Sequence, residues 1–269
     1  MNNKNMKMHY GLRKMPFSAD VDVKDYYQLN NMLNVQSGIS FTLESSMNYA
    51  LIGEIGAGKS SLLDYVIDSI NRQEQYRLIK VVGGKWGMTE FLRTVLSEFN
   101  SSTTTNRPSR MLRELGTAID GIKEDGLKPV LCVDEAHLLD SSIFQQLHLL
   151  SQQGKKGMMP IVLVGQYDLV DKLKQPLARP FLSRIGDSFT VQALSQNEAL
   201  GYIDHHLNEI AQISLSTIEE QAKIAITQLG LNVMRNINRI ALKSLHIAML
   251  NDRTQVCVSD VKEAHTQPI

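Results

Sequence analysis

The segment GEIGAGKS, residues 53 to 60, constrains the fold of this chain more than any other feature. It fits the pattern G-x-x-x-x-G-K-[ST], follows the apolar run YALIG (49–53) and precedes a stretch of helical periodicity. A glycine-rich turn between a strand and a helix lets backbone N–H groups surround a phosphate, while the helix directs its positive end toward it. The pattern therefore predicts a strand, a phosphate-binding loop and a helix in succession.

The same segment supplies the candidate nucleotide ligands. Lys59 is expected to bridge the β- and γ-phosphates, and the Ser60 hydroxyl to hold a metal ion. The predicted cofactors are therefore ATP and Mg²⁺. The residues expected to bind them here are Gly53, Glu54, Gly56, Ala57, Gly58, Lys59, Ser60 and Ser61.

A second motif, LCVDEAHLLD (131–140), places two carboxylates at the end of a short apolar run. Open α/β sheets bind their ligands at the carboxyl ends of the strands. Asp134 is therefore the candidate Mg²⁺ ligand, and Glu135 the candidate base that polarises a water for attack on the γ-phosphate. His137 is interpreted as a local packing or hydrogen-bonding residue, outside the catalytic set. The letters DEAH also name a helicase class, but a helicase needs a second lobe, and the strand pattern stops near residue 193.

Short apolar runs alternate with helical stretches over the first two thirds of the chain, as in a parallel sheet covered by helices. After residue 193 the pattern is helical only. We therefore expect an α/β domain over residues 1–192, with an N-terminal extension over 1–24, and a small all-helical lid over 193–269. The expected strands are 49–53, 78–83, 130–134, 161–165 and 188–192, and the expected helices of the first domain include 59–72, 87–99, 108–124 and 141–152.

The chain has no formal net charge, with 28 basic and 28 acidic residues, so binding to nucleic acid would require a local patch. The segment from Arg77 to Arg113 has seven basic and two acidic residues. Its candidate DNA contacts are Lys85, Arg107, Arg110 and Arg113, with Lys155 and Lys156 as a second possible contact and solvated surfaces as the alternative. Two distant cysteines and the lack of an apolar run near 18 residues favour a cytoplasmic protein without a membrane span.

The order of these motifs, with three further segments, resembles the AAA+ ATPases. The segments are PIVLVGQYDL (160–169), RPFLSRIGDSFTVQALSQNEALGYIDHHL (179–207) and GLNVMRNINRIALKSL (230–245). They are similar in particular to the ExeA-type (general secretion pathway A) ATPase domain and to the transposon target-selection ATPases of the TnsC, TniB and Mu B type. The opening HYGLRKMPFSADVD (9–22) also resembles the start of the ExeA-type domain. The resemblance implies a P-loop AAA+ three-layer sandwich with a five-stranded parallel sheet, followed by the helical lid.

The resemblance also implies roles for polar residues beyond the two motifs. Gln166 matches the sensor 1 residue that reads the γ-phosphate, and Arg184 matches the arginine finger that acts on a neighbouring subunit, with Arg179 as the alternative finger. Arg235 matches the sensor 2 arginine. The family pattern there is Gly-x-Pro-Arg, and in this chain Met234 replaces the proline. Arg239 is the alternative sensor 2 residue. A finger that acts in trans implies a homo-oligomer, either a ring or a helical filament.

Three functions are compatible with such an ATPase. In the first, an ATP-loaded oligomer binds duplex DNA without sequence preference and recruits or activates a transposase, as the resemblance to target-selection ATPases implies. In the second, the ATPase serves a secretion apparatus. In the third, it is a regulatory switch that binds another protein and no DNA. The first reading agrees best with the basic segment.

Overall fold

The computed structural model describes residues 5–18, 20–72, 75–151 and 159–266, so Lys155 and Lys156 lie outside the described residues. The chain forms two compact units. An α/β unit comprises Asn30–Ile55 and Lys59–Val191, and a helical unit comprises Met1–Leu29, Gly56–Gly58 and Gln192–Ile269. The N-terminal segment, expected as an extension of the α/β domain, thus groups with the helices instead. The sequence could not indicate this grouping because it depends on contacts between distant residues.

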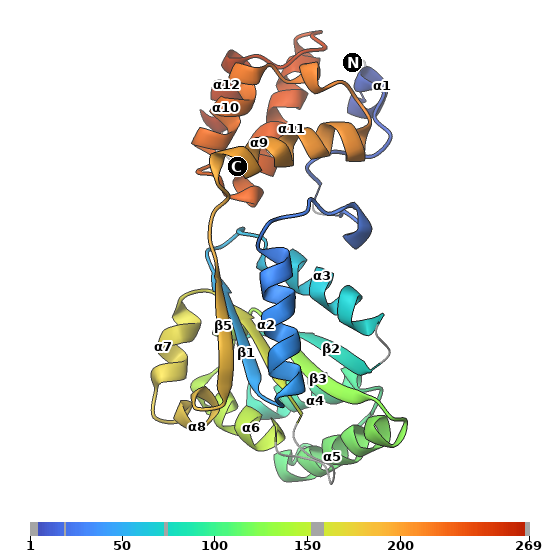
Figure 1. The fold of residues 1–269 in the computed structure, drawn as a ribbon, viewed down its shortest axis with the longest axis vertical. Helices are drawn as coiled ribbons and strands as arrows, with labels where there is room; N and C mark the ends of the chain where they lie inside the picture. The colour runs from blue at the N-terminus through green and yellow to red at the C-terminus, as the bar shows by residue number, and fades with distance from the viewer. Residues whose placement is uncertain (1–4, 19, 73–74, 152–158, 267–269) are drawn as a thin grey trace. The chain divides into compact units, whose positions relative to one another are not determined.

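The α/β unit contains one sheet of five strands in the order β2-β3-β4-β1-β5, and each recorded pair of neighbouring strands is parallel. This arrangement confirms the predicted α/β fold with a five-stranded parallel sheet. The strands alternate with helices along the chain, so each crossover passes over a face of the sheet (Figure 1). The strands are β1 (Asn48–Gly53), β2 (Tyr76–Val82), β3 (Lys128–Asp134), β4 (Ile161–Gly165) and β5 (Ile185–Val191).

The burial of each strand follows its place in the sheet. The central strands β1 and β4 are buried along their whole length, as expected where helices cover both faces. The edge strands differ: β2 is partly exposed, and β5 is exposed over most of its residues. Asn48 fixes the amino end of β1, because it is fully buried and its Oδ1 accepts a hydrogen bond from Ile161 N of β4 at 3.0 Å.

Helices cover the two faces of this sheet. On one face, α2 (Met32–Glu44) contacts β1 and β5, and α3 (Lys59–Asn71) contacts β1, β2 and β4 (Figure 1). The other face packs against α4 (Met88–Glu98), α5 (Pro108–Glu124) and α6 (Ser141–Ser151), whose apolar residues join those of β2, β3 and β4 in one core. The chain between β4 and β5 adds α7 (Asp168–Lys174) and α8 (Arg179–Leu182).

The helical unit confirms the predicted run of helices after residue 193. Its first helix, α9 (Gln196–His205), begins with a capping box in which Ser195 and Glu198 satisfy each other's backbone N–H groups. It continues as a π-helix over His206–Ala211. The other elements are a 3-10 turn (Leu215–Thr217), α10 (Glu220–Leu229), α11 (Met234–Leu250) and α12 (Val258–Thr266). No helix in the described part of the chain is long and apolar enough to cross a membrane.

The N-terminal segment, with α1 (Met6–Tyr10) and a 3-10 turn (Val23–Asp25), packs against these helices. One group of its contacts surrounds His206, which is 3% exposed. The ring of His206 stacks on Phe17 with centroids 4.8 Å apart, and its Nδ1 accepts a hydrogen bond from Phe17 N at 3.1 Å. Tyr202 meets the same ring edge-on at 4.6 Å. These contacts hold the segment to the helical unit.

Burial makes the stability of this unit depend on pH through His206. Burial, and to a smaller extent the charge of the neighbouring His205, lowers the pKa of His206 from 6.5 to about 3. Between these values the unfolded chain binds a proton that the folded chain does not, so stability is complete above about pH 6.5 and falls as the pH is lowered. We expect a loss of up to about 1.4 kcal/mol per pH unit relative to His206→Asn, which keeps an acceptor but does not titrate.

Urea unfolding of both proteins at pH 7.5, 6 and 5, followed by circular dichroism, measures this difference. A stability difference between the two proteins that stays constant over this range would show that His206 does not have the lowered pKa.

Candidate nucleotide-binding site

The phosphate loop connects the end of β1 at Gly53 to the start of α3 at Lys59. Two of its glycines have a left-handed backbone, with φ of +79° at Gly56 and +92° at Gly58, which residues with a side chain adopt only at a cost. A Cβ on Gly53 would lie 2.5 Å from the carbonyl oxygen of Val191 on β5. Glycine is therefore required at all three positions by local geometry.

Lys59 is the buried cation of this loop. Its side chain is 7% exposed, and its Nζ donates hydrogen bonds to the carbonyl oxygens of Gly53 at 2.9 Å and Glu54 at 2.7 Å. A lysine held against the loop backbone is positioned to act on phosphate oxygens within the same loop. Ser60 and Ser61 follow in the first turn of α3, where the free N–H groups of the helix lie.

The order of strands brings the second motif to the same edge. Because β4 lies between β1 and β3 and all three are parallel, their carboxyl ends at Gly53, Gly165 and Asp134 share one edge of the sheet. Gln166, the predicted sensor 1 residue, follows directly after β4. The structure thus places Asp134, Gln166 and the start of the phosphate loop on one edge.

Asp134 ends β3 with its side chain buried, beside a lysine that belongs to neither of the two nucleotide motifs. Its Oδ2 lies 3.6 Å from Nζ of Lys80 on β2, and the same Nζ lies 2.6 Å from Oδ1 of Asp64 on α3. Burial acts to lower the pKa of Lys80, but the hydrogen bond with Asp64 and the two negative charges outweigh it, so this pKa is raised. Lys80 is therefore a permanent cation between two carboxylates. The one sequence feature that could have indicated this role is the position of Lys80 as a charged residue within the apolar run LIKVV.

Glu135 has an unusual backbone conformation. Its φ of 51° and ψ of 33° lie in the left-handed region, which is uncommon for a residue with a side chain. Its N–H donates to Oδ1 of Asp134 at 2.9 Å, and its carbonyl accepts from Leu138 N at 2.9 Å. Gly83, which directly follows β2, approaches so closely that a Cβ on it would lie 2.8 Å from the Glu135 carbonyl oxygen. The backbone of the predicted base is therefore tightly held, while its side chain is 37% exposed.

His137 lies next to the predicted base. It is 8% exposed, and its Nδ1 is 3.4 Å from Oε2 of Glu135 and 3.4 Å from the backbone N of Gln166. The interpretation of His137 as a hydrogen-bonding residue agrees with these contacts. Their partners, however, are the predicted base and the residue at the predicted sensor position, which the sequence spacing did not reveal.

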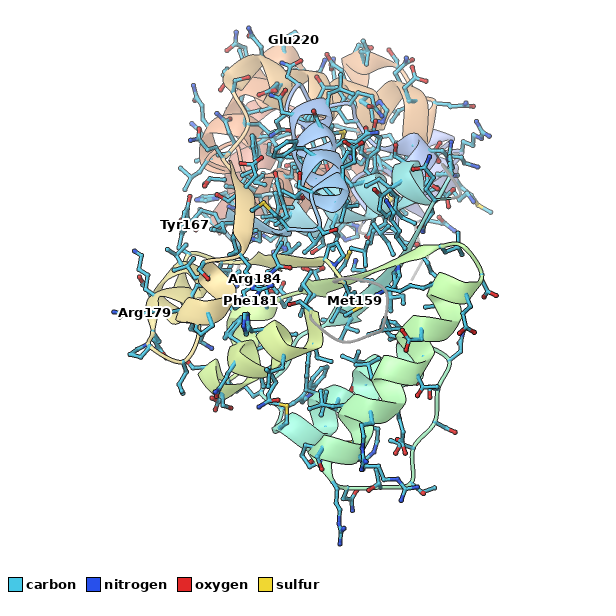
Figure 2. All side chains as sticks on the ribbon, turned by 60° about the horizontal axis from the view of Figure 1, so that its bottom comes forward. Met159, Tyr167, Arg179, Phe181, Arg184 and Glu220 are labelled. Atoms are coloured by element: carbon cyan, nitrogen blue, oxygen red, sulfur yellow. The ribbon has the colours of Figure 1, made fainter. Side chains whose placement is uncertain are left out.

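The two candidate finger residues lie around α8, near the amino ends of the strands and away from the phosphate loop (Figure 2). The carbonyl oxygen of Arg184 accepts a hydrogen bond from Asn48 N at 3.0 Å, and β5 begins at the next residue. From Asn48 to Gly53 the strand covers about 16 Å, at roughly 3.3 Å per residue. Arg184 is therefore separated by the length of β1 from the phosphate-binding end of its own sheet. Arg179, at the start of α8, is exposed.

The two candidate sensor 2 residues both lie on α11 of the helical unit. Arg235 is the second residue of this helix and is exposed, and Arg239 follows one turn later on the same side. Assignment of either arginine to the nucleotide remains a prediction.

Three of the four candidate DNA contacts gather at the start of α5. Arg107, Arg110 and Arg113 are all exposed, and the first turn of this helix contains no acidic residue. Arg93 of α4 joins them, because its guanidinium donates a hydrogen bond to Oδ1 of Asn106 at 2.6 Å. Arg110 also pairs with Glu114 at 3.3 Å, which reduces its net charge. Lys85 is exposed on a different segment, between β2 and α4.

The residues at this edge fit a Mg²⁺-nucleotide. The two left-handed glycines permit the backbone to turn around a phosphate, and Lys59 supplies the positive charge. Mg²⁺ prefers oxygen ligands and is commonly held by one or two carboxylates together with substrate phosphates. The carboxylate of Asp134 and the hydroxyl of Ser60 supply ligands of that kind. Bound ATP would bring the phosphoanhydride bond that is to be broken, and Mg²⁺ would neutralise its charge.

The fold defined by this sheet, loop and carboxylate pair is the AAA+ P-loop fold, and comparison with known proteins agrees. Residues 43–173 match the family described as the AAA domain. General secretion pathway protein A of Aeromonas hydrophila is 23% identical over 261 residues, which cover 95% of this chain and 47% of that protein. The chain thus spans about half the length of this relative.

Solved structures share the fold at low sequence identity. The ORC2 protein of Aeropyrum pernix, in its ADPNP–ADP complexes, superposes with a TM-score of 0.70 at 12% identity, covering 93% of this chain and 71% of that one. The ORC1 protein of the same organism, in complex with DNA, gives a TM-score of 0.68 at 10% identity, covering 90% and 66%.

Proposed function

We propose that this protein hydrolyses ATP with Mg²⁺, and that it couples this reaction to assembly on duplex DNA. The observation that carries the proposal is the shared edge of the sheet, where Asp134 and Gln166 lie at the ends of the strands next to the phosphate loop. Lys59 and Ser60 bind the phosphates and the metal ion. Asp134 holds the metal ion, and Glu135 takes the proton of the attacking water.

The second part of the proposal is that each ATP site is completed by a neighbouring subunit. Support comes from Arg184, which lies about 16 Å along β1 from the phosphate loop of its own chain, further than an arginine side chain reaches. A contact between unlike surfaces of successive subunits builds a ring or a helical filament. Arg184 then acts as the finger that stabilises the charge developing on the neighbour's nucleotide, and Arg179 is the alternative.

Replacing Arg184 by alanine tests this assignment. We expect ATP binding to remain within about twofold of the parent and the hydrolysis rate to fall by roughly 10³-fold, which is typical for loss of an arginine finger. Mixing Arg184→Ala with Glu135→Gln in equal amounts should restore activity, because about a quarter of randomly formed interfaces then pair an intact base with an intact finger. Arg179→Ala tests the alternative finger, and Arg72→Ala, at an exposed arginine of the same unit, is the matched control. A mixture that stays as inactive as its two components would contradict a finger that acts in trans.

DNA binding is proposed for the arginine cluster, defined as Arg93, Arg107, Arg110 and Arg113. These side chains are exposed around the positive end of α5, where they suit phosphate groups regardless of sequence. The complex of Aeropyrum pernix ORC1 with DNA shows that a protein of this fold is compatible with DNA binding. Lys85 is a separate proposed contact.

Fluorescence anisotropy of a labelled random-sequence duplex tests this proposal directly, with no nucleotide, ADP or a slowly hydrolysed ATP analogue at several salt concentrations. We expect tight binding only with the ATP analogue. Replacing Arg107, Arg110 and Arg113 by glutamine should weaken it and lower the slope of log K against log salt by about 2 to 3. The control replaces the exposed Arg72, Lys128 and Lys174 by glutamine, with the same change in charge. Equal losses in the two triple variants would refute a specific role of the cluster.

The finer proposal is that the DNA-bound oligomer recruits or activates a transposase, and it rests on the motif resemblance to transposon target-selection ATPases. The relationship to general secretion pathway protein A favours work with a secretion apparatus as a second candidate. A regulatory switch that binds only proteins is the third. Absence of DNA binding in every nucleotide state would leave only the last two.

A further inference from the structure

The contacts of His137 raise a question of hydrogen-bond chemistry. The Nδ1 atom of an imidazole forms one hydrogen bond in the plane of the ring, as a donor if it carries a hydrogen and as an acceptor if it carries a lone pair. With a lone pair, it accepts the N–H of Gln166, 3.4 Å away; with a hydrogen, it donates to the Glu135 carboxylate, also 3.4 Å away. It cannot do both at once. The tautomer and a small rotation of His137 therefore decide which of the two partners it serves.

The backbone of Glu135 is held in place, so the choice that His137 makes between its two partners acts on the Glu135 side chain. The Glu135 backbone is held in the left-handed region by hydrogen bonds at its N–H and its carbonyl, while its side chain reaches partial exposure. A carboxylate that accepts a hydrogen bond from His137 is directed toward the imidazole and away from water. The state of His137 therefore sets the direction of this carboxylate.

The end of β4 is built to approach His137 closely. A Cβ on Gly165 would lie 3.2 Å from the backbone N of His137 and 3.0 Å from Cδ2 of Leu169. Glycine therefore lets the strand that ends at Gln166 lie directly against the turn that carries His137. No side chain at residue 165 separates the end of β4 from this turn.

We propose that His137 is a positioning residue whose Nδ1 alternates between the backbone N–H of Gln166 and the carboxylate of Glu135, and so couples the strand end beside the γ-phosphate to the base. The inference rests on the proposed ATPase function and deepens it. When Nδ1 accepts from Gln166, Glu135 is free to orient water. When Nδ1 donates to Glu135, the carboxylate is held back, which limits hydrolysis until the site is assembled.

Three substitutions separate this role from simple packing. Asparagine places its amide close to the position of Nδ1, glutamine places it close to that of Nε2, and leucine offers no hydrogen bond. We expect His137→Asn to keep kcat within about fivefold of the parent, and His137→Gln and His137→Leu to lower kcat by roughly 10- to 100-fold. The Kd of a slowly hydrolysed ATP analogue should stay within about twofold in all three. A leucine variant with the parental kcat, or equal losses in the asparagine and glutamine variants, would overturn the proposal.

A spectroscopic readout separates this inference from the ATPase proposal itself. In protein labelled with nitrogen-15 histidine, the His137 signals are assigned as those missing from His137→Asn. The Nδ1 resonance should move between its protonated and unprotonated positions when Mg²⁺ and the ATP analogue are added, and should not move in Lys59→Ala. An unmoved resonance in an active parent protein overturns the role of His137 alone. A parent that neither binds nor hydrolyses ATP overturns the proposed function and this inference with it.

Discussion

Replacement of Lys59 by alanine is expected to abolish measurable ATP binding. The Lys59 ammonium is buried in the loop and already forms hydrogen bonds with the carbonyl oxygens of Gly53 and Glu54, so it is pre-positioned for a phosphate. Loss of a charge-assisted contact of this kind costs about 3 kcal/mol or more, which raises Kd by at least roughly 100-fold. Isothermal titration with Mg²⁺ and an ATP analogue measures the change.

The matched control is Lys128→Ala, which removes an exposed lysine from the same unit. Thermal unfolding of both variants shows whether the fold is kept. An unchanged Kd for the nucleotide in a folded Lys59→Ala protein would rule out the segment 53–60 as the phosphate-binding loop.

Replacement of Glu135 by glutamine is expected to separate binding from hydrolysis. Glutamine keeps the size of the side chain and a hydrogen-bonding oxygen, but it cannot take a proton from water. Loss of a positioned general base slows the reaction by about 10²- to 10⁴-fold, whereas the Kd of ATP should remain within about twofold. The variant should therefore accumulate in the ATP-bound, assembled state, and light scattering measures that assembly.

Asp134→Asn is the comparison variant, because Asp134 is the predicted Mg²⁺ ligand. In this variant the Kd of the nucleotide should depend less on Mg²⁺, whereas in Glu135→Gln that dependence should be unchanged. Hydrolysis at the parental rate by Glu135→Gln would show that another group is the base.

The sheet could be predicted from sequence because its strands are short apolar runs. β1, β3 and β4 are buried on both faces, and a parallel strand between two helical layers has to be apolar along its length. α2 was not predicted, although it covers β1 and β5, because its 13 residues lack a strong alternation of apolar and polar sides. α12 was likewise not anticipated.

Part of the candidate site could be predicted from sequence, namely the residues that lie together in one short motif. Gly53 to Ser61 and Asp134–Glu135 belong to such patterns, and the strand order brings Asp134 to the edge where β1 ends. Lys80 and His137 were not predictable in their roles. Lys80 reaches Asp134 across two neighbouring strands, and His137 reaches Gln166 from a segment 29 residues away, so both contacts depend on strand register. The association of Phe17 with His206 is longer in range still, at 189 residues.

The measurement that tests the account most directly is the steady-state release of phosphate from Mg²⁺-ATP as a function of protein concentration. If each active site joins Glu135 of one subunit to Arg184 of the next, the rate per subunit should rise with concentration and reach a plateau once assembly is complete. Light scattering on the same samples should show oligomers over the same range. A rate per subunit that stays constant down to concentrations where the protein is monomeric, or no hydrolysis at any concentration, would contradict the account.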